Sequence, residues 1–143
     1  MMTRDQIRQA LIRDEDVVQS AYQDSLGYWT IAVGRLIDAR KGGRLSLPEC
    51  YYLLDNDLDR SIAGCTAAFP WFARLDPVRQ GVLVQMVFQM GVDGVQAFTQ
   101  TLGAIRRGDY QAAALGMLAS KWATKDSPGR AARLAAQMER GAL

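Results

Sequence analysis

The sequence predicts a single α+β domain, mainly α, in which a small β-containing lobe and a C-terminal helical bundle are joined by a long helix. Strand-forming residues are concentrated in residues 21–36, whereas helix periodicity and capping signals dominate after residue 45. A run that is apolar almost all round, residues 82–90, marks a buried central helix. We expect the small lobe to span about residues 14–63, with residues 1–13 and 64–143 forming the helical lobe of one 143-residue domain.

The N-terminal region predicts a short helix followed by a hairpin. Thr3 followed by Gln6 forms a capping-box pattern, and the helix that it opens should fade near residues 13–16. Strand-forming residues on both sides of a turn at residues 25–27 then predict a β-hairpin. A third short strand is expected within residues 39–45.

The rest of the chain reads as helix. The Ser-Leu-Pro-Glu sequence at 46–49 predicts the start of a long helix that runs to Gly64. The pair Asp76-Pro77 starts the central helix, which Gly91 should end. Further helix starts and breaks are predicted by N-cap residues and glycines. The starts are Thr99, Asp109 and Ser127, and the breaks are Gly103, Gly108 and residues 125–126.

Composition narrows the chemistry. No stretch approaches the roughly 20 apolar residues of a membrane span, so stable membrane insertion is not expected, and the charged N-terminus does not resemble a secretory signal peptide. Cys50 and Cys65 lie on one expected helix, roughly 20 Å apart, which is too far for a disulfide.

The basic segment 121–143 favours a polyanionic partner: nucleic acid, a membrane surface or an anionic cell wall. The chain has no histidine, so acid–base chemistry must fall to carboxylates.

Glu15 and Asp24 are the candidate pair of carboxylates. Glu15 lies where the first helix ends, and Asp24 lies in the hairpin that follows, so both can line one wall of a groove. Glycoside hydrolysis needs one carboxyl to donate a proton and a second, ionised, to activate water or stabilise positive charge. Thr30, on the same hairpin, can offer a hydroxyl to the attacking water. Spacing alone does not single these residues out from fifteen acidic side chains.

Three longer passages add to this pattern. The first joins Arg13-Asp14-Glu15 to Tyr22-x-Asp24-x-x-Gly27-Tyr28-Trp29-Thr30-Ile31-x-Val33-Gly34-x-Leu36. The second comprises Asp76-x-Val78-Arg79, Met86-Val87-Phe88-Gln89-Met90-Gly91 and Gly94-Val95-x-x-Phe98-Thr99. The third, weaker passage is Ser120-Lys121-Trp122 with Pro128-x-Arg130-Ala131-x-Arg133. Over nearly the whole chain these passages resemble the phage lysozymes, N-acetylmuramidases of the T-even endolysin type with a two-lobed fold.

The resemblance implies roles for individual residues. Glu15 would be the proton donor, Asp24 the carboxylate across the scissile bond, and Thr30 the residue that positions water, with inversion at the anomeric carbon. Inversion requires the two carboxyl groups to lie roughly 6.5–9.5 Å apart. Arg130 would pair with the catalytic glutamate. The positions that match saccharide contacts are Leu36, Phe88, Gln89 and Thr101, although Phe88 is equally compatible with the core.

The amide of Gln89 needs polar partners, which substrate hydroxyls or backbone groups would supply. Trp29 and Trp122 are expected to be packing residues. The family's histidine after the hairpin glycine is Arg35 here, and its acidic partner is kept as Asp57, so an Arg35–Asp57 ion pair is expected.

Other positions depart from the resemblance. An acidic turn residue of the family is Leu26 here, a hairpin glycine is Ala32, and an asparagine that contacts substrate is Gly116. The segment between Arg35 and Ser46 is also shorter, which predicts a trimmed small lobe.

The resulting hypothesis is an endolysin that hydrolyses the β-1,4 bond between N-acetylmuramic acid and N-acetylglucosamine. No metal or cofactor is implied, nucleic acid is not the expected partner, and a monomer is expected. The resemblance further implies accumulation in the host cytoplasm, release through a holin and action on periplasmic peptidoglycan. A lytic transglycosylase and a catalytically weak wall-binding or virion module stay open as alternatives.

Overall fold

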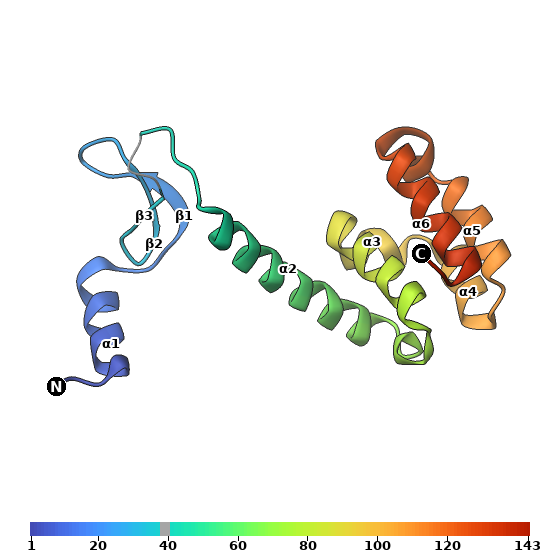
Figure 1. Ribbon diagram of the computed structural model, residues 1–143, viewed down its shortest axis with the longest axis horizontal. Coiled ribbons are helices and arrows are strands. Elements are labelled where there is room, and N and C mark those ends of the chain that lie inside the picture. The colour runs from blue at the N-terminus through green and yellow to red at the C-terminus, as the bar shows by residue number, and fades with distance from the viewer. Residues whose placement is uncertain (38–40) are drawn as a thin grey trace. The chain divides into compact units, whose positions relative to one another are not determined.

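The computed structural model describes residues 1–37 and 41–143 and divides into two compact units, Met1–Tyr52 and Leu53–Leu143. A helix and a three-stranded antiparallel sheet make up most of the first unit, whereas the second is helical (Figure 1). This mainly helical architecture with one small sheet confirms the predicted α+β class. The predicted lobe limits, with residues 1–13 in the helical lobe, stay a prediction.

Helix α1 (Arg4–Glu15) begins with the predicted capping box. Gln6 N donates to Thr3 Oγ1 at 3.2 Å, and Thr3 N donates to Gln6 Oε1 at 2.8 Å. The helix ends where predicted, because Asp16 has a φ of 65° and turns the chain out of the helix. Glu15 therefore lies at the point where α1 meets the sheet.

The sheet consists of β1 (Val18–Gln23), β2 (Trp29–Ala32) and β3 (Arg35–Leu36), in that order. The predicted hairpin is confirmed, but the predicted position of the third strand is wrong. Residues 39–40 of that prediction lie outside the described residues, and residues 41–45 form no strand. The strand comes earlier because Gly34 takes a φ of 62°, which allows a tight turn directly after β2.

Helix α2 (Leu47–Ala68) starts after Ser46, whose Oγ accepts a hydrogen bond from Glu49 N at 3.4 Å. The helix continues four residues beyond its predicted end at Gly64. This glycine serves close packing instead, because a Cβ built there would lie 2.8 Å from Val92 Cγ2. Cys50 and Cys65, both on α2, form no disulfide with each other, as expected from their separation along the helix.

The helical unit is built around α3 (Pro77–Gln96), the predicted central helix. Val82, Leu83 and Met86 of α3 have no solvent exposure. The elements that follow α2 around α3 are short. They are η1 (Phe72–Arg74), α4 (Thr99–Arg107), α5 (Tyr110–Leu118), the π-helical turn η2 (Trp122–Asp126) and α6 (Pro128–Arg140).

The glycine breaks are confirmed in part. Gly108 ends α4 in the left-handed conformation. Gly91 interrupts α3 with a φ of 76°, but helical backbone resumes and continues to Gln96. The break predicted at Gly103 is wrong, since this residue lies inside α4, where the Arg107 side chain covers it.

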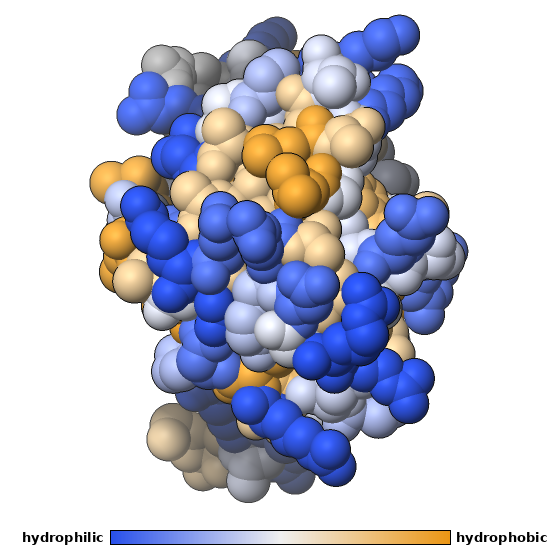
Figure 2. Space-filling model, turned by 90° about the vertical axis from the view of Figure 1, so that its right-hand side faces the viewer, coloured by the Kyte–Doolittle hydropathy of each residue, from blue (hydrophilic) through white to orange (hydrophobic). Residues whose placement is uncertain are grey.

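Some large apolar side chains are exposed on the helical unit. On α5, Leu115 and Leu118 are exposed, and the face shown in Figure 2 is mainly hydrophilic with small apolar patches. Within residues 1–37 and 41–143, none of the helices combines the length and the apolar character needed to cross a bilayer.

Candidate active site

The carboxylate of Glu15 lies against Gly34, in the turn between β2 and β3. A Cβ built on Gly34 would lie 2.6 Å from Glu15 Oε2 and 2.9 Å from its carboxyl carbon. Any side chain at position 34 would therefore collide with the carboxylate. The glycine makes room for Glu15 as well as forming the turn, and Glu15 itself is exposed.

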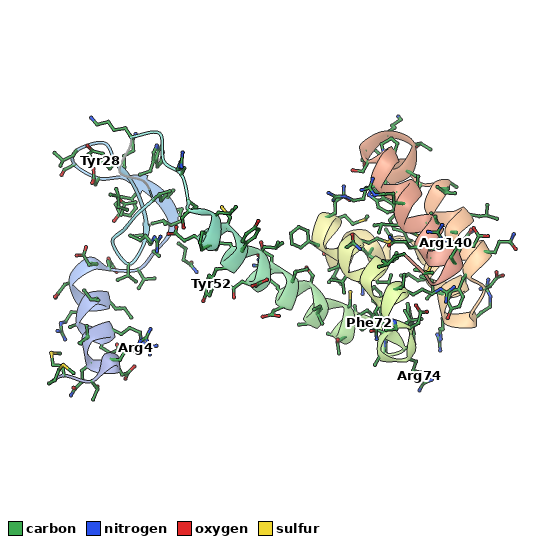
Figure 3. The ribbon with its side chains drawn as sticks, in the orientation of Figure 1. Arg4, Tyr28, Tyr52, Phe72, Arg74 and Arg140 are labelled. Atoms are coloured by element: carbon green, nitrogen blue, oxygen red, sulfur yellow. The ribbon has the colours of Figure 1, made fainter. Side chains whose placement is uncertain are left out.

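The carboxylate of Asp24 is oriented by the β1–β2 turn. Its Oδ1 accepts hydrogen bonds from Leu26 N at 2.9 Å and from Tyr28 N at 2.8 Å. These bonds form an Asx-type turn and fix one oxygen, which directs the plane of the carboxylate. Tyr28 is labelled at this end of the sheet in Figure 3. The hydrogen bond from position 26 comes from the backbone N–H of Leu26. It therefore does not depend on the acidic side chain that the resembling family carries at this position.

Thr30 is buried in β2, with 6% of its surface exposed. Its Oγ1 donates to the carbonyl oxygen of Tyr28 at 3.3 Å, so the lone pairs of Oγ1 can still accept a hydrogen bond from water. Thr30 is directly opposite Leu36 in β3, which places these two side chains on one face of the sheet.

The first unit contains five of the predicted site residues: Glu15, Asp24, Thr30, Leu36 and Arg35. Gln23, the last residue of β1, pairs with Trp29, so Asp24 follows directly on the strand that neighbours the strand of Thr30. The predicted carboxyl separation of about 6.5–9.5 Å stays a prediction.

Arg35 forms an ion pair with Glu49, in the first turn of α2. The hydrogen bond from Arg35 is the main cause that holds the pKa of Glu49 below its usual value. Glu49 was not predicted as the partner of Arg35, because the resemblance implies Asp57 in that role. Asp57 pairs with Arg60, one turn further along α2. The expected Arg35–Asp57 and Arg130–Glu15 pairs would each join the two units, and both stay predictions.

Phe88 and Thr101 line two different pockets of the helical unit. Phe88 is 44% exposed on α3, which excludes it from the core, and it lines a pocket of about 430 Å³ with Val87 and Val92. Thr101 is 3% exposed and lines a pocket of about 500 Å³ beside Trp122. Their predicted contacts with saccharide stay predictions.

Gln89 finds both of its side-chain partners within the helical unit. Its Oε1 accepts from Trp122 Nε1 at 3.0 Å, and its Nε2 donates to Ser127 Oγ at 2.7 Å. Protein side chains therefore satisfy an amide whose partners were expected to be substrate or backbone groups. Trp122 is a packing residue, as expected: it is 5% exposed and lies edge-on to Phe98. A substrate contact by Gln89 stays a prediction.

Gly116 lies directly against Thr101. A Cβ built on Gly116 would lie 2.4 Å from Thr101 Oγ1. The position that carries an asparagine in the resembling family thus provides space for a hydroxyl here. Sequence alone could not show that these two positions touch.

Glu15 and Asp24 are compatible with the glycoside hydrolase class, because one carboxylic acid and one carboxylate are the groups that cleave glycosidic bonds. The match to known sequences agrees with this class. Residues 13–140 match the Phage lysozyme family, and the chain belongs to that family. It is a glycoside hydrolase, a lysozyme-like enzyme that acts on peptidoglycan.

Individual relatives are similar along most of this chain. Probable T4-type lysozyme 1 of Dictyostelium discoideum is 28% identical, and the alignment covers 96% of this chain and 95% of the relative. Probable T4-type lysozyme 2 of the same organism is 26% identical with the same coverage. The Pre-baseplate central spike protein Gp5 of Enterobacteria phage T4 is 30% identical over 87% of this chain, which corresponds to 26% of that protein.

Proposed function

We propose that this enzyme hydrolyses the β-1,4 bond between N-acetylmuramic acid and N-acetylglucosamine with inversion, using Glu15 as general acid and Asp24 as the second carboxylate. The observation that carries the proposal is the close approach of the Glu15 carboxylate to Gly34. Gly34 lies two residues beyond the strand that holds Thr30, so the Glu15 carboxylate lies near the end of that strand.

In the proposed reaction, the protonated carboxyl of Glu15 donates its proton to the glycosidic oxygen as the bond to the anomeric carbon breaks. A water molecule attacks that carbon from the opposite face and gives its proton to Asp24. The fixed Oδ1 of Asp24 is already engaged by two backbone N–H groups, so the second oxygen, Oδ2, is the proposed base. Thr30 Oγ1 accepts a hydrogen bond from the attacking water.

The test is the rate at which purified peptidoglycan sacculi are solubilised. Glu15→Gln should lower the rate about 10²–10⁴-fold, which is the range of general acid catalysis. Asp14→Asn is the matched control, because Asp14 is the exposed neighbouring carboxylate, and it should retain the wild-type rate. Equal rates for the wild type and Glu15→Gln would overturn the assignment of Glu15.

Analysis of the products separates hydrolysis from transglycosylation. Hydrolysis leaves reducing muramic ends, and the proposed inversion gives the α-anomer as the first product. A lytic transglycosylase uses one glutamate and leaves anhydro ends. Anhydro ends in the digest would contradict roles for Asp24 and Thr30 in directing water.

A wall-binding or virion module is the second candidate, favoured by one observation, the 30% identity to the T4 spike protein. Sacculi that sediment with the wild-type protein but are never solubilised would support this candidate. Solubilisation that depends on Glu15 would exclude a purely structural role.

We further propose a role in host lysis as a monomer that accumulates in the cytoplasm, passes a holin pore and acts in the periplasm. Family membership supports this proposal. Expression in a Gram-negative host should cause lysis only after the inner membrane is permeabilised. Lysis without permeabilisation would contradict the need for a holin.

A further inference from the structure

A pocket of about 500 Å³ in the helical unit has no role in the proposed reaction. It lies between the connection that follows α2 and the end of α4, and it shares no lining residue with the pockets that contain Phe88 and Thr101. Its lining combines guanidinium groups and aromatic rings, and it includes Trp71, Arg74, Ile105, Arg106, Arg107 and Tyr110.

The positive charge of this arginine pocket is not compensated. Arg74, Arg106 and Arg107 are exposed, and within residues 1–37 and 41–143 none of them forms an ion pair. Figure 3 shows Arg74 on the outside of the connection between α2 and α3. The two acidic residues closest in sequence to the pocket have other functions. Asp109 caps α5 by accepting from Ala112 N at 3.1 Å, and Asp76 pairs with Arg79.

The aromatic walls of the arginine pocket are held by contacts outside it. Trp71 stacks on Phe69 with ring centroids 5.3 Å apart. The guanidinium of Arg79 covers the ring of Tyr110 at 3.5 Å from its centroid. Arg79 itself is 13% exposed and is fixed by hydrogen bonds. Since these walls are in place before a ligand arrives, binding costs little ordering entropy.

We propose that the arginine pocket binds carboxylate groups of the peptidoglycan peptide stem, as a second wall-binding site distinct from the residues that cut the glycan. Guanidinium groups bind carboxylates through paired N–H donors. Peptidoglycan, on which this family acts, carries free carboxylates on its peptide stems. The proposal rests on peptidoglycan being the polymer that this chain binds, and it does not require Glu15 to be the acid.

The experiment measures binding of the full chain to purified sacculi by co-sedimentation at 4 °C, in the Glu15→Gln background so that the polymer stays intact. The test variant replaces Arg74, Arg106 and Arg107 with glutamine. A matched variant removes three exposed cations of the basic segment 121–143, outside the pocket: Lys125→Gln, Arg133→Gln and Arg140→Gln. It tests whether the general basic charge of that segment, and not the pocket, accounts for binding. We expect the pocket variant to raise the Kd at least tenfold and the matched variant to raise it less than threefold.

Chemical modification of the sacculi tests whether carboxylates are the groups that the pocket binds. On sacculi whose carboxylates have been converted to neutral methylamides, wild type and pocket variant should bind equally. Equal binding to untreated sacculi would overturn the proposal. The proposal would also be overturned if the pocket variant lost binding only to vesicles that contain phosphatidylglycerol and not to sacculi. That result would indicate that the pocket recognises lipid phosphate. Thermal unfolding of each variant checks the fold, and the three single replacements provide the same comparison if the triple variant is unfolded.

Discussion

Gly34 and Glu15 are in direct contact: the carboxylate of the proposed acid occupies the space that a side chain at position 34 would need. Helix α1 ends at Glu15, and the turn that contains Gly34 follows β2. Two segments well separated in sequence thus meet at the proposed acid, and a single glycine permits their approach.

Gly34→Ala should displace the Glu15 carboxylate and lower the rate of sacculus solubilisation by about 10- to 100-fold, because small misplacements of a catalytic group are costly. The positive φ of 62° adds a strain of about 1–2 kcal/mol. Gly108→Ala is the matched control, since it has a φ of 79° and no atom lies within 4 Å of an added Cβ. Gly108 lines the arginine pocket but supplies none of its guanidinium or aromatic groups. It should lose stability to a similar degree and keep its activity per folded molecule, as measured by urea unfolding and sacculus assays. Equal activity in Gly34→Ala and Gly108→Ala would contradict the positioning role.

Arg35→Gln should raise the pKa of Glu49 towards its ordinary value, because the hydrogen bond from Arg35 is what mainly lowers it. NMR titration of the glutamate carboxyl carbons measures this shift directly. Asp57→Asn should leave the titration of Glu49 unchanged. An unchanged titration of Glu49 in Arg35→Gln would contradict the Arg35–Glu49 pair.

Gly116→Ala should displace Thr101, whose Oγ1 lies 2.4 Å from the added Cβ position. Overpacking of this kind costs about 1–3 kcal/mol. The double variant Gly116→Ala with Thr101→Ala removes the colliding hydroxyl and should recover part of the loss in urea unfolding. If the two single losses simply add in the double variant, the contact does not limit packing.

Local signals predicted most helix ends well, because the groups that form a cap lie within one turn of each other. The capping box of Thr3 and Gln6, the start after Ser46 and the stop at Gly108 all follow from residues three or four apart. A glycine that serves tertiary packing gave one of the errors. Gly64 faces Val92 from another helix, and nothing near Gly64 in sequence reveals this contact.

The same distinction holds at the site. Glu15, Asp24 and Thr30 could be selected by chemistry and by resemblance, since their residue types carry the reaction. Partners that depend on tertiary packing could not be selected in this way. Ser127 lies 38 residues from Gln89 yet accepts its hydrogen bond, and such a pairing is set by how α3 packs against the start of α6.

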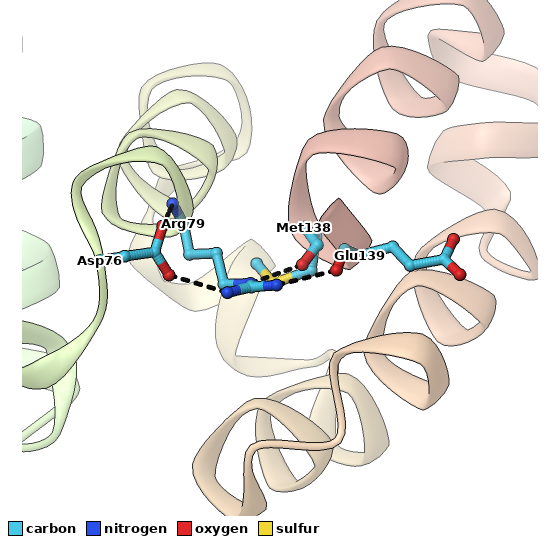
Figure 4. Close-up of polar contacts among 4 residues, drawn as sticks. All are labelled: Asp76, Arg79, Met138 and Glu139. Atoms are coloured by element: carbon cyan, nitrogen blue, oxygen red, sulfur yellow. Dashed lines mark hydrogen bonds and ion pairs between the residues drawn. The ribbon is translucent and has the colours of Figure 1, made fainter. Parts of the chain in front are cut away.

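Replacing Arg79 should destabilise the helical unit. Its Nε donates to Met138 O at 2.6 Å and its Nη2 to Glu139 O at 2.8 Å, so it binds carbonyls in the last turn of α6 (Figure 4). Arg79→Leu leaves these acceptors and Asp76 without their partner, which should cost about 2–4 kcal/mol in urea unfolding. Arg133→Leu, at an exposed position of α6, should change stability by less than about 0.5 kcal/mol. A loss below about 1 kcal/mol for Arg79→Leu would show that water replaces the guanidinium.

Asp76 should make the stability of the helical unit sensitive to acid. Burial raises the pKa of Asp76, but hydrogen bonds from Arg79 N and from the Arg79 guanidinium outweigh this effect and leave the pKa lowered. A carboxyl whose pKa is lower in the folded state stabilises the protein above its unfolded pKa of about 3.9. That contribution is lost as the pH falls through the folded pKa.

Asp76→Asn tests this linkage because the asparagine oxygen can still accept the capping hydrogen bond from Arg79 N. The free energy of unfolding in urea is measured for both proteins at pH 6 and at pH 2.5. Wild type should lose more stability between these two values than Asp76→Asn, since the remaining carboxylates titrate in both proteins and their effects cancel in the comparison. Equal losses would mean that the Asp76–Arg79 ion pair contributes no net stability, and that the capping hydrogen bond accounts for the contribution of Asp76.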